Sequence, residues 1–439
     1  MSTWGWRSHL HCLVPLGWAL QAAGHEVRVA SHPSMTEAIS SAGLAAVPLG
    51  EDVDFAAEFG PRMGKVGRLD RDGQRTAEPG GTAKPGGTAK PDGTAKPDGT
   101  VEPDGPLEPA ITADGGVVRF AAALVGDLVE FGRAYRPDLL IWEPFNLAAA
   151  VASAALAVPG VLQLWGPDSS VTLRLDQQTV IGPLAGRFGL GAAQVSLTGN
   201  LMLDPVPPPM QVPLSGPSEP VRFVPYNGTA VVPGWLRRPA PRPRVCVTAG
   251  TMMAGAGFAG RMDLTAIIRA VAELDVEVVV AVDPAQLAGL GQVPGNVRLA
   301  DAPLALRLVL PSCAALVQQG GAGTTMTALV YGVPQLILPQ VSDQHFNGER
   351  LAATGAGTWL ATEQAGPGQV RDVVGELVGD ESWRERAALM SERVRQMPAP
   401  AEVVPVLAAL AEGAAARSGR DPAGGQTVIR VQDRQEARR

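Results

Sequence analysis

Cysteine is scarce in this chain. Its 439 residues include only Cys12, Cys246 and Cys313, which are widely spaced and odd in number. Structural zinc sites need closely spaced ligands and disulfide frameworks need paired cysteines, so this pattern predicts neither. We expect reduced thiols, which favour a cytoplasmic location.

Positive charge is also in short supply. The formal net charge is -7 at pH 7, and arginine supplies nearly all of the cations. A nucleic-acid-binding protein normally carries a basic face, so this balance argues against that class. The length of 439 residues and the 46% hydrophobic content allow two or three cores, since a domain takes about 150 residues.

Uninterrupted apolar runs of membrane-spanning length are absent from the sequence. The run from Leu10 to Leu20 imitates a secretory signal, but GHEVRVAS follows at once and completes a helix-to-strand unit. The stretch from Phe145 to Trp165 contains Pro159 and several polar residues, which divide it into a buried helix and a buried strand. The pattern therefore predicts no membrane span.

Residues 72–109 are poor in large apolar side chains. They form a slipping hexapeptide, PGGTAK, PDGTAK and PDGTVE, which cannot bury enough apolar area to order a core. We predict a disordered insertion that is dispensable for activity, with a partner-docking segment as the alternative. The polar tail at 413–439 is predicted to be disordered as well.

Outside these segments, short apolar strands alternate with helical patterns. The predicted strands are VRVA, LLIW, VLQLW, RVCVTAG, VEVVVAV and LILP, and this alternation indicates an α/β fold with parallel sheets. A proline-rich linker at 221–244 separates a Rossmann-like acceptor domain, 1–220, from a second Rossmann-like domain, 245–412. Ligands bind at the carboxyl ends of parallel strands, so two facing sheets predict an interdomain cleft.

The most informative segment is VQQGGAGTTMTALVYGVPQLILPQVSDQHFNGERL, from Val317 to Leu351. It predicts a glycine-rich turn, an apolar helix, a buried strand and a polar loop that contains the DQ pair. Gly320, Gly321 and Gly323 leave the backbone open to a ligand, and the helix N-terminus after them favours phosphate. An ordinary tight loop is the alternative, which the DQ pair after the next strand makes less favourable.

These residues resemble the donor-binding signature of GT-B glycosyltransferases that use nucleotide sugars. The resemblance is closest to bacterial enzymes that attach deoxysugars to macrolide and polyketide aglycones. It spans most of the chain, through SHLHCLVPLGWALQAAGHEVRVASHP, PDLLIWEP, LWGPD, VRFVPYNGTAVVPGWLRRP, VCVTAGT, LPSCAALV and the segment quoted above. It implies an inverting transfer, without a metal or other cofactor, from a dTDP-linked sugar to a hydroxyl of a hydrophobic aglycone. Some members also require a helper protein, which is the one protein partner that the resemblance suggests.

The first half offers a candidate base. Deprotonating a sugar-accepting hydroxyl requires a group of near-neutral pKa, which is usually histidine. In the resembling family a histidine of the N-terminal loop is the general base, and an acidic residue after a later strand orients it; His9 and Glu143 match these positions. Without the family, His9 is better interpreted as a loop histidine that caps the following helix. His11 is close enough to compete.

The second half offers donor-binding residues. The resemblance assigns the diphosphate to Thr251, Gln319, Gly320, Gly321, Gly323 and Thr324, and the sugar hydroxyls to Asp343 and Gln344. A carboxylate accepts hydrogen bonds and an amide both donates and accepts them, which suits a polyol. The alternatives are a simple turn at Thr251 and a solvated loop at Asp343 and Gln344.

Three departures from the family pattern bear on function. Gln319 stands where most members have a histidine, which exchanges a charge-assisted hydrogen bond for a neutral one and weakens leaving-group stabilisation roughly tenfold. The stretch VRLADAPLALRLVLPSC lacks the aromatic residue that usually stacks on the base. The chain also begins where relatives have a short apolar strand before the His9 loop, so we expect an upstream start that would raise solubility.

The sequence therefore predicts an inverting deoxysugar transferase. The competing prediction is a catalytically silent GT-B protein that supports another transferase, motivated by the same three departures. A dinucleotide-dependent dehydrogenase is less favoured, because no GxGxxG turn with a following ribose-binding acid occurs at a plausible first strand.

Overall fold

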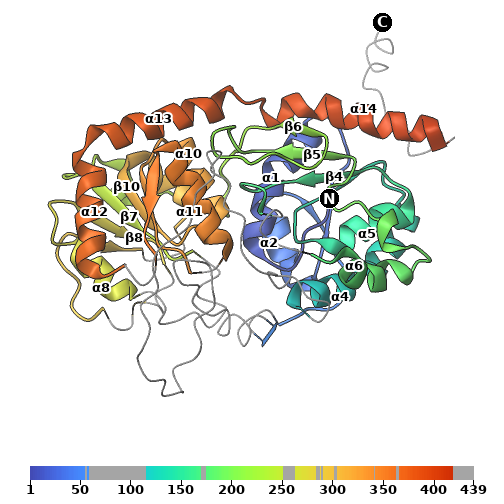
Figure 1. Cartoon of the computed structure of the whole chain (residues 1–439), viewed down its shortest axis with the longest axis horizontal. Coiled ribbons are helices and arrows are strands. Elements are labelled where there is room, and N and C mark those ends of the chain that lie inside the picture. Colours follow the sequence, from blue (N-terminus) through green and yellow to red (C-terminus); the bar gives the residue numbers. More distant parts are fainter. Residues whose placement is uncertain are drawn as a thin grey trace, which may run out of the picture.

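The computed structural model describes residues 1–54, 57–58, 115–169, 175–250, 263–282, 287, 290–300, 304–340, 342–361 and 365–418. Its helices and strands form two α/β units side by side (Figure 1). The predicted insertion at 72–109, the predicted diphosphate ligand Thr251 and the tail from 419 onward lie outside these residues.

The first unit contains a parallel sheet of short strands. Its elements are α1 Arg7–Ala22, β1 Arg28–Ser31, α2 Thr36–Ser41, β2 Ala45–Pro48, α4 Gly116–Tyr135, β3 Leu140–Trp142, α5 Leu147–Leu156, β4 Gly160–Gln163, α6 Gln177–Gly186, β5 Leu201–Asp204 and β6 Ser218–Pro220. Strands β3, β4, β5 and β6 pair in that order, and β1 pairs with β2. The predicted helix and strand within the stretch from Phe145 to Trp165 are confirmed as α5 and β4.

Residues 1–3 join these two groups of strands. Ser2 forms bridges with Ala30 of β1 and with Trp142 of β3. Its N–H donates to the carbonyl of Ile141 over 2.8 Å, and the N–H of Thr3 donates to Ala30 over 3.1 Å. Residues 1–3 therefore lie between β1 and β3. The sequence predicts that the strand preceding the His9 loop in relatives is missing from this chain, and these three residues stand directly before that loop.

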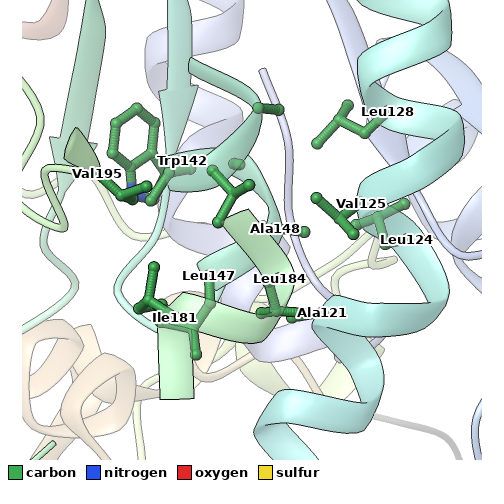
Figure 2. Close-up of a cluster of buried hydrophobic side chains, with 14 of the residues drawn as sticks. Ala121, Leu124, Val125, Leu128, Trp142, Leu147, Ala148, Ile181, Leu184 and Val195 are labelled. Atoms are coloured by element: carbon green, nitrogen blue, oxygen red, sulfur yellow. The ribbon is translucent and has the colours of Figure 1, made fainter. Parts of the chain in front are cut away.

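Helices α4, α5 and α6 cover one face of this sheet. Figure 2 shows Leu124, Val125 and Leu128 of α4 near Ala148 of α5, with the indole of Trp142 on the opposite side of the cluster. The members of this cluster are almost fully buried. Small alanine side chains on α5 allow the helices to pack closely, and the apolar area removed from water stabilises the unit at about 25 cal/mol per Å².

The second unit is a six-stranded parallel sheet in the order β12-β11-β10-β7-β8-β9. Its elements are β7 Arg244–Val247, α8 Leu264–Val271, β8 Glu277–Val280, β9 Val297–Leu299, α9 Leu306–Val309, β10 Cys313–Gln318, α10 Ala322–Val330, β11 Gln335–Ile337, α11 Ser342–Thr354, β12 Gly357–Trp359, α12 Pro367–Gly379 and α13 Glu381–Gln396. Strands β7 and β8 are buried along their whole length, as expected for a parallel sheet covered on both faces. Each of the six predicted strands overlaps a strand of the structure.

In each sheet the strand order reverses at one point. In the second unit the reversal lies between β7 and β10, and the glycine-rich turn directly follows β10. In the first unit it lies between residues 1–3 and β3, which are followed by His9 and Glu143. Crevices at such switch points are the usual ligand sites of open α/β sheets. Topology therefore places both groups of predicted site residues at the expected edges.

The last helix, α14 Pro400–Ser418, leaves the second unit and lies across the first (Figure 1). Val403, Val404 and Leu407 are buried against Leu10 and Leu13 of α1. The prediction that 413–439 is a disordered tail is wrong for 413–418, which form the end of this helix. The prediction that residues up to 412 belong to the second domain is wrong for α14, because its apolar face completes the core of the first unit.

Among the described residues, no single helix combines the length and the apolar content of a membrane span. The bent pair of α13 and α14 reaches that threshold when taken together, by length and composition only.

Candidate active site

His9 and Glu143 are in direct contact. His9 is the third residue of α1, and its Nδ1–H donates to Oε2 of Glu143 over 3.0 Å. Glu143 directly follows β3 and its side chain is fully buried. Parallel strands direct the residues that follow them to one edge of the sheet, which brings together two residues 134 positions apart.

The carboxylate of Glu143 is held by two further hydrogen bonds. The N–H of Trp4 donates to its Oε1 over 3.1 Å, and the N–H of Phe145 donates to its Oε2 over 2.9 Å. A carboxylate fixed in this way accepts from Nδ1–H and leaves Nε2 of the neutral imidazole as the basic nitrogen. The arrangement corresponds to the histidine and carboxylate of a hydrolytic triad.

Aromatic rings surround the imidazole of His9. The ring centroid of Trp165 lies 4.2 Å from that of His9, Trp4 lies at 4.9 Å and Phe145 at 5.6 Å. Trp4 is buried, whereas Trp165 and Phe145 are half-buried. The imidazole of His9 therefore lies in an apolar wall of the kind that suits a hydrophobic ligand.

The glycine-rich turn ends at the N-terminus of α10. Gly321 is the N-cap residue, and no described side chain caps the helix there. The first N–H groups of a helix lack intrahelical partners and carry a partial positive charge. Gly323 in this first turn is exposed and would place a Cβ in open space. These amides form a site for an anion such as a phosphate.

Gln318 and Gln319 differ in role. Gln318 is fully buried and its amide donates to Thr325 Oγ1 and to Gln335 Oε1, both over 2.9 Å, while its Oε1 accepts from the N–H of Gly320. It therefore holds the turn in shape. The amide of Gln319 lies against Gly250 and Gly321, and its Oε1 is buried without a hydrogen-bond partner among the described residues. Of the two, Gln319 is therefore the one whose side-chain oxygen is left without a partner among the described residues.

Helix α11 supports the turn from behind. Asp343 and Gln344 lie in its first turn, so the prediction of a polar loop at these residues is wrong. Gln344 is 1% exposed, and its Oε1 accepts from the N–H of Gln340 over 2.8 Å. Asn347 donates to the carbonyl of Gly320 over 2.8 Å. The helix thus fixes the backbone of the turn as well as presenting Asp343.

Gly320 is required for this packing. Its φ is +98°, and a Cβ there would lie 2.8 Å from Ile337 Cγ2 and 2.9 Å from the carbonyl oxygen of Gln344. The space that we expected to admit a ligand is therefore filled by α11 and β11. Among Gly320, Gly321 and Gly323, only Gly323 has open space at the position of a Cβ.

The two units meet beside these groups. A Cβ on Gly166, which follows Trp165, would lie 2.6 Å from Cβ of Ala322, the first residue of α10. Burial raises the pKa of Asp343, and the backbone N–H of Asp343 and the charge of His9 lower it. The loop that places Trp165 against His9 therefore meets the start of α10 in the second unit.

Comparison with known proteins identifies the family of the chain. Residues 18–89 and 110–250 match the family described as erythromycin biosynthesis protein CIII-like, N-terminal domain, and residues 265–410 match its C-terminal domain. The chain belongs to this glycosyltransferase family. The predicted resemblance and the GT-B fold are thereby confirmed.

Similar proteins align with nearly the whole length of this glycosyltransferase. TDP-daunosamine transferase DnrS of Streptomyces peucetius is 35% identical over 91% of this chain and 94% of its own length. The 10-deoxymethynolide desosaminyltransferase of Streptomyces venezuelae is 35% identical over 96% of this chain and 98% of its own length. The crystal structure of the glycosyltransferase VinC in complex with dTDP has a TM-score of 0.71 at 28% identity, covering 94% of this chain and 100% of that one.

Sequence reasoning missed several residues of this glycosyltransferase site. Asn347 lies three residues after the DQ pair, and this helical spacing was the available signal. Trp165 lies in the quoted LWGPD segment without an assigned role. Its position against His9 depends on the pairing of β4 beside β3, which no local pattern encodes.

His11, the competing histidine, points elsewhere. Its ring contacts Tyr226 in the linker, with centroids 5.3 Å apart. Burial and the charges of Arg7, Arg307 and His9 lower its pKa to about 4. Only His9 of these two histidines contacts the buried carboxylate. Among the described residues, no group of three or more His, Cys, Asp or Glu side chains has the arrangement of a metal site.

Proposed function

We propose that this glycosyltransferase moves a deoxysugar from dTDP to a hydroxyl of a hydrophobic polyketide or macrolide aglycone, with inversion and without a metal cofactor. Relatives named for daunosamine and desosamine transfer, and a similar structure in complex with dTDP, support the substrate classes. The observation that carries the proposal is the contact of His9 with Glu143 beside the N-termini of α10 and α11.

The proposed chemistry is a single displacement. The acceptor oxygen forms a bond to the anomeric carbon while the bond from that carbon to the diphosphate oxygen breaks, and the bonding electrons leave with dTDP. The acceptor proton passes to Nε2 of His9. The buried carboxylate of Glu143 holds Nδ1–H and stabilises the imidazolium as it forms.

The leaving diphosphate takes its stabilisation from neutral groups. The amides at the start of α10, the side chain of Gln319 and the hydroxyl of Thr324 are the proposed contacts, together with Gly321, Gly323 and Thr251. Asp343 is the proposed acceptor for sugar hydroxyls. Gln344 is proposed to support this site without contacting the sugar through Oε1, because that oxygen already accepts a hydrogen bond from the N–H of Gln340.

A catalytically silent role is not favoured. Both groups needed for proton transfer are in contact, and the relatives reported above are named as transferases. All three cysteines are free thiols, which supports the proposed cytoplasmic location. A helper protein remains the proposed protein partner, carried by the family resemblance alone.

Substrate transfer is the direct test. The purified protein is incubated with TDP-daunosamine, and separately with a dTDP-linked desosamine, in the presence of aklavinone, 10-deoxymethynolide or tylactone, and products are identified by mass spectrometry. Calorimetry with dTDP runs in parallel. We expect dTDP binding and glycosylation of at least one aglycone. A protein that does not bind dTDP would refute the proposal, since a transferase must bind its leaving group.

A further inference from the structure

A set of contacts connects α11 with the first unit. The guanidinium of Arg350 on α11 donates through Nε to the carbonyl of Met210 over 3.0 Å. It also donates through one terminal nitrogen to the carbonyls of Pro209 over 3.2 Å and Gln211 over 3.0 Å. Residues 209–211 follow β5 of the first unit. One side chain thus binds three successive carbonyls across the two units.

Met210 fixes the same segment by packing. Its side chain is fully buried in a cluster with Met326 and Leu329 of α10 and Leu351 of α11. Removing a buried side chain of this kind leaves a cavity that destabilises its surroundings, so Met210 ties the segment to these two helices. The backbone around Gln211 is therefore attached to the second unit as well as to β5 of the first.

Gln211 connects this segment with the loop after β4. Its Oε1 accepts from the N–H of Asp168 over 2.9 Å and from the N–H of Val212 over 2.9 Å. Its Nε2 donates to Oδ1 of Asp204 over 2.7 Å. The side-chain amide is thus held by Asp204 at the end of β5 and by the N–H of Val212. Its oxygen also binds the loop through the N–H of Asp168.

That loop forms the wall of the active site. Trp165 lies three residues before Asp168 and packs edge-on against His9, with ring centroids 4.2 Å apart. Gly166 lies against Ala322 at the start of α10. The bond from Asp168 to Gln211 therefore holds the loop that carries Trp165 beside His9 and Gly166 beside the start of α10.

We propose that Gln211 is a positioning residue that sets Trp165, and through it His9, relative to the donor-binding helices. The inference rests on the proposed role of His9 as the base. Asp343 and Arg350 lie on the same helix, so the proposed sugar contact and the support of the base belong to one rigid element. Transfer needs the acceptor oxygen and the anomeric carbon in register, and a shift of about 1 Å costs on the order of a hundredfold in rate.

The test uses an isosteric change, Gln211→Met, which keeps the volume of the side chain and removes its hydrogen bonds. The readout is the Cε1–H resonance of His9 in protein labelled with ¹³C-histidine, because the edge-on Trp165 ring shifts that resonance. Trp165→Ala supplies the reference position without the ring. We expect the resonance in Gln211→Met to move toward that reference or to broaden.

The matched control is Asn296→Ala. Asn296 also makes two hydrogen bonds to the backbone, donating from Nδ2 to the carbonyls of Ala272 and Val276, but it lies in the second unit away from the site. We expect this variant to lose thermal stability and to leave the His9 resonance unchanged. A Gln211→Met protein with an unshifted His9 resonance would overturn the inference, as would equal shifts in both variants.

Kinetics supply the second readout. With whichever of the three aglycones is the acceptor, Gln211→Met is expected to lower kcat by about tenfold or more. The Kd for dTDP should stay within about twofold of its original value, because the diphosphate site is intact. A change confined to thermal stability would show a merely structural role. Failure of the unaltered protein to bind dTDP would count against the proposed function and would leave the resonance comparison valid.

Discussion

The two sides of the active site handle charge in different ways. On the side of the first unit, a buried carboxylate with three hydrogen-bond donors holds one ring nitrogen of His9. On the side of the second unit, the described groups proposed for the diphosphate are backbone amides, the hydroxyl of Thr324 and the neutral side chain of Gln319. In the proposed mechanism, proton transfer therefore depends on one ionisable pair, whereas the diphosphate depends on oriented dipoles.

Removing the base should give the largest effect. His9→Ala is expected to lower kcat by about a hundredfold or more, because no other described histidine contacts Glu143. The affinity for dTDP should not change, since the diphosphate site belongs to the other unit. Single-turnover kinetics and calorimetry measure the two quantities. Near-normal turnover would remove His9 from the mechanism.

Pushing the two sides apart should come next. Gly166→Ala places a Cβ 2.6 Å from that of Ala322, so one unit must shift. We expect kcat to fall by roughly tenfold to a hundredfold with little change in dTDP affinity. Gly379→Ala, at the end of α12, is the control, because a Cβ there meets no atom within 4 Å. Equal activity of both variants would show that the contact has no role in transfer.

Adding charge to the neutral side should have a moderate effect. Gln319→His is expected to bind dTDP about tenfold more tightly at pH 6, because an imidazolium makes a charge-assisted hydrogen bond to phosphate. The advantage should fade as pH rises and the imidazole becomes neutral. Calorimetry at several pH values checks this, with the exposed Gln292→His as control. An affinity that is unchanged at every pH would show that residue 319 does not face the diphosphate.

The smallest effect concerns stability. The pKa of His11 is lowered from 6.5 to about 4 by burial and by the charges of Arg7, Arg307 and His9. As pH falls below 6.5, the unfolded state takes up a proton at His11 before the folded state does. The free energy of unfolding therefore decreases as pH falls from 6.5 toward 4. His11→Phe keeps an aromatic contact with Tyr226 and should therefore show a flatter dependence of Tm on pH.

Thermal melts across this pH range compare His11→Phe with the original protein and with His25→Phe, which changes an exposed histidine. The control should follow the original curve. If all three curves coincide, the buried His11 makes no contribution to acid sensitivity.

Much of the local structure was predictable because burial leaves a periodic pattern. Both faces of β7 and β8 are covered, and their short apolar runs, rich in valine, indicated parallel strands. The apolar helix predicted after the glycine-rich turn is present as α10. The polar loop predicted at Asp343 and Gln344 was wrong because their polarity resembles that of a loop, whereas their side chains serve the first turn of a helix.

The amino-acid sequence by itself determined the order of strands and helices, the glycine-rich turn and, through resemblance to a family, the prediction of His9 as base and Glu143 as its carboxylate. Tertiary structure alone decided that α14 completes the first unit, that α11 fills the space at Gly320, and that Gln211 reaches the loop against His9. The physical reason is the distance along the chain over which each effect acts. Propensity and periodicity act over a few residues, whereas these contacts join groups that only the sheet topology brings within hydrogen-bonding or van der Waals distance.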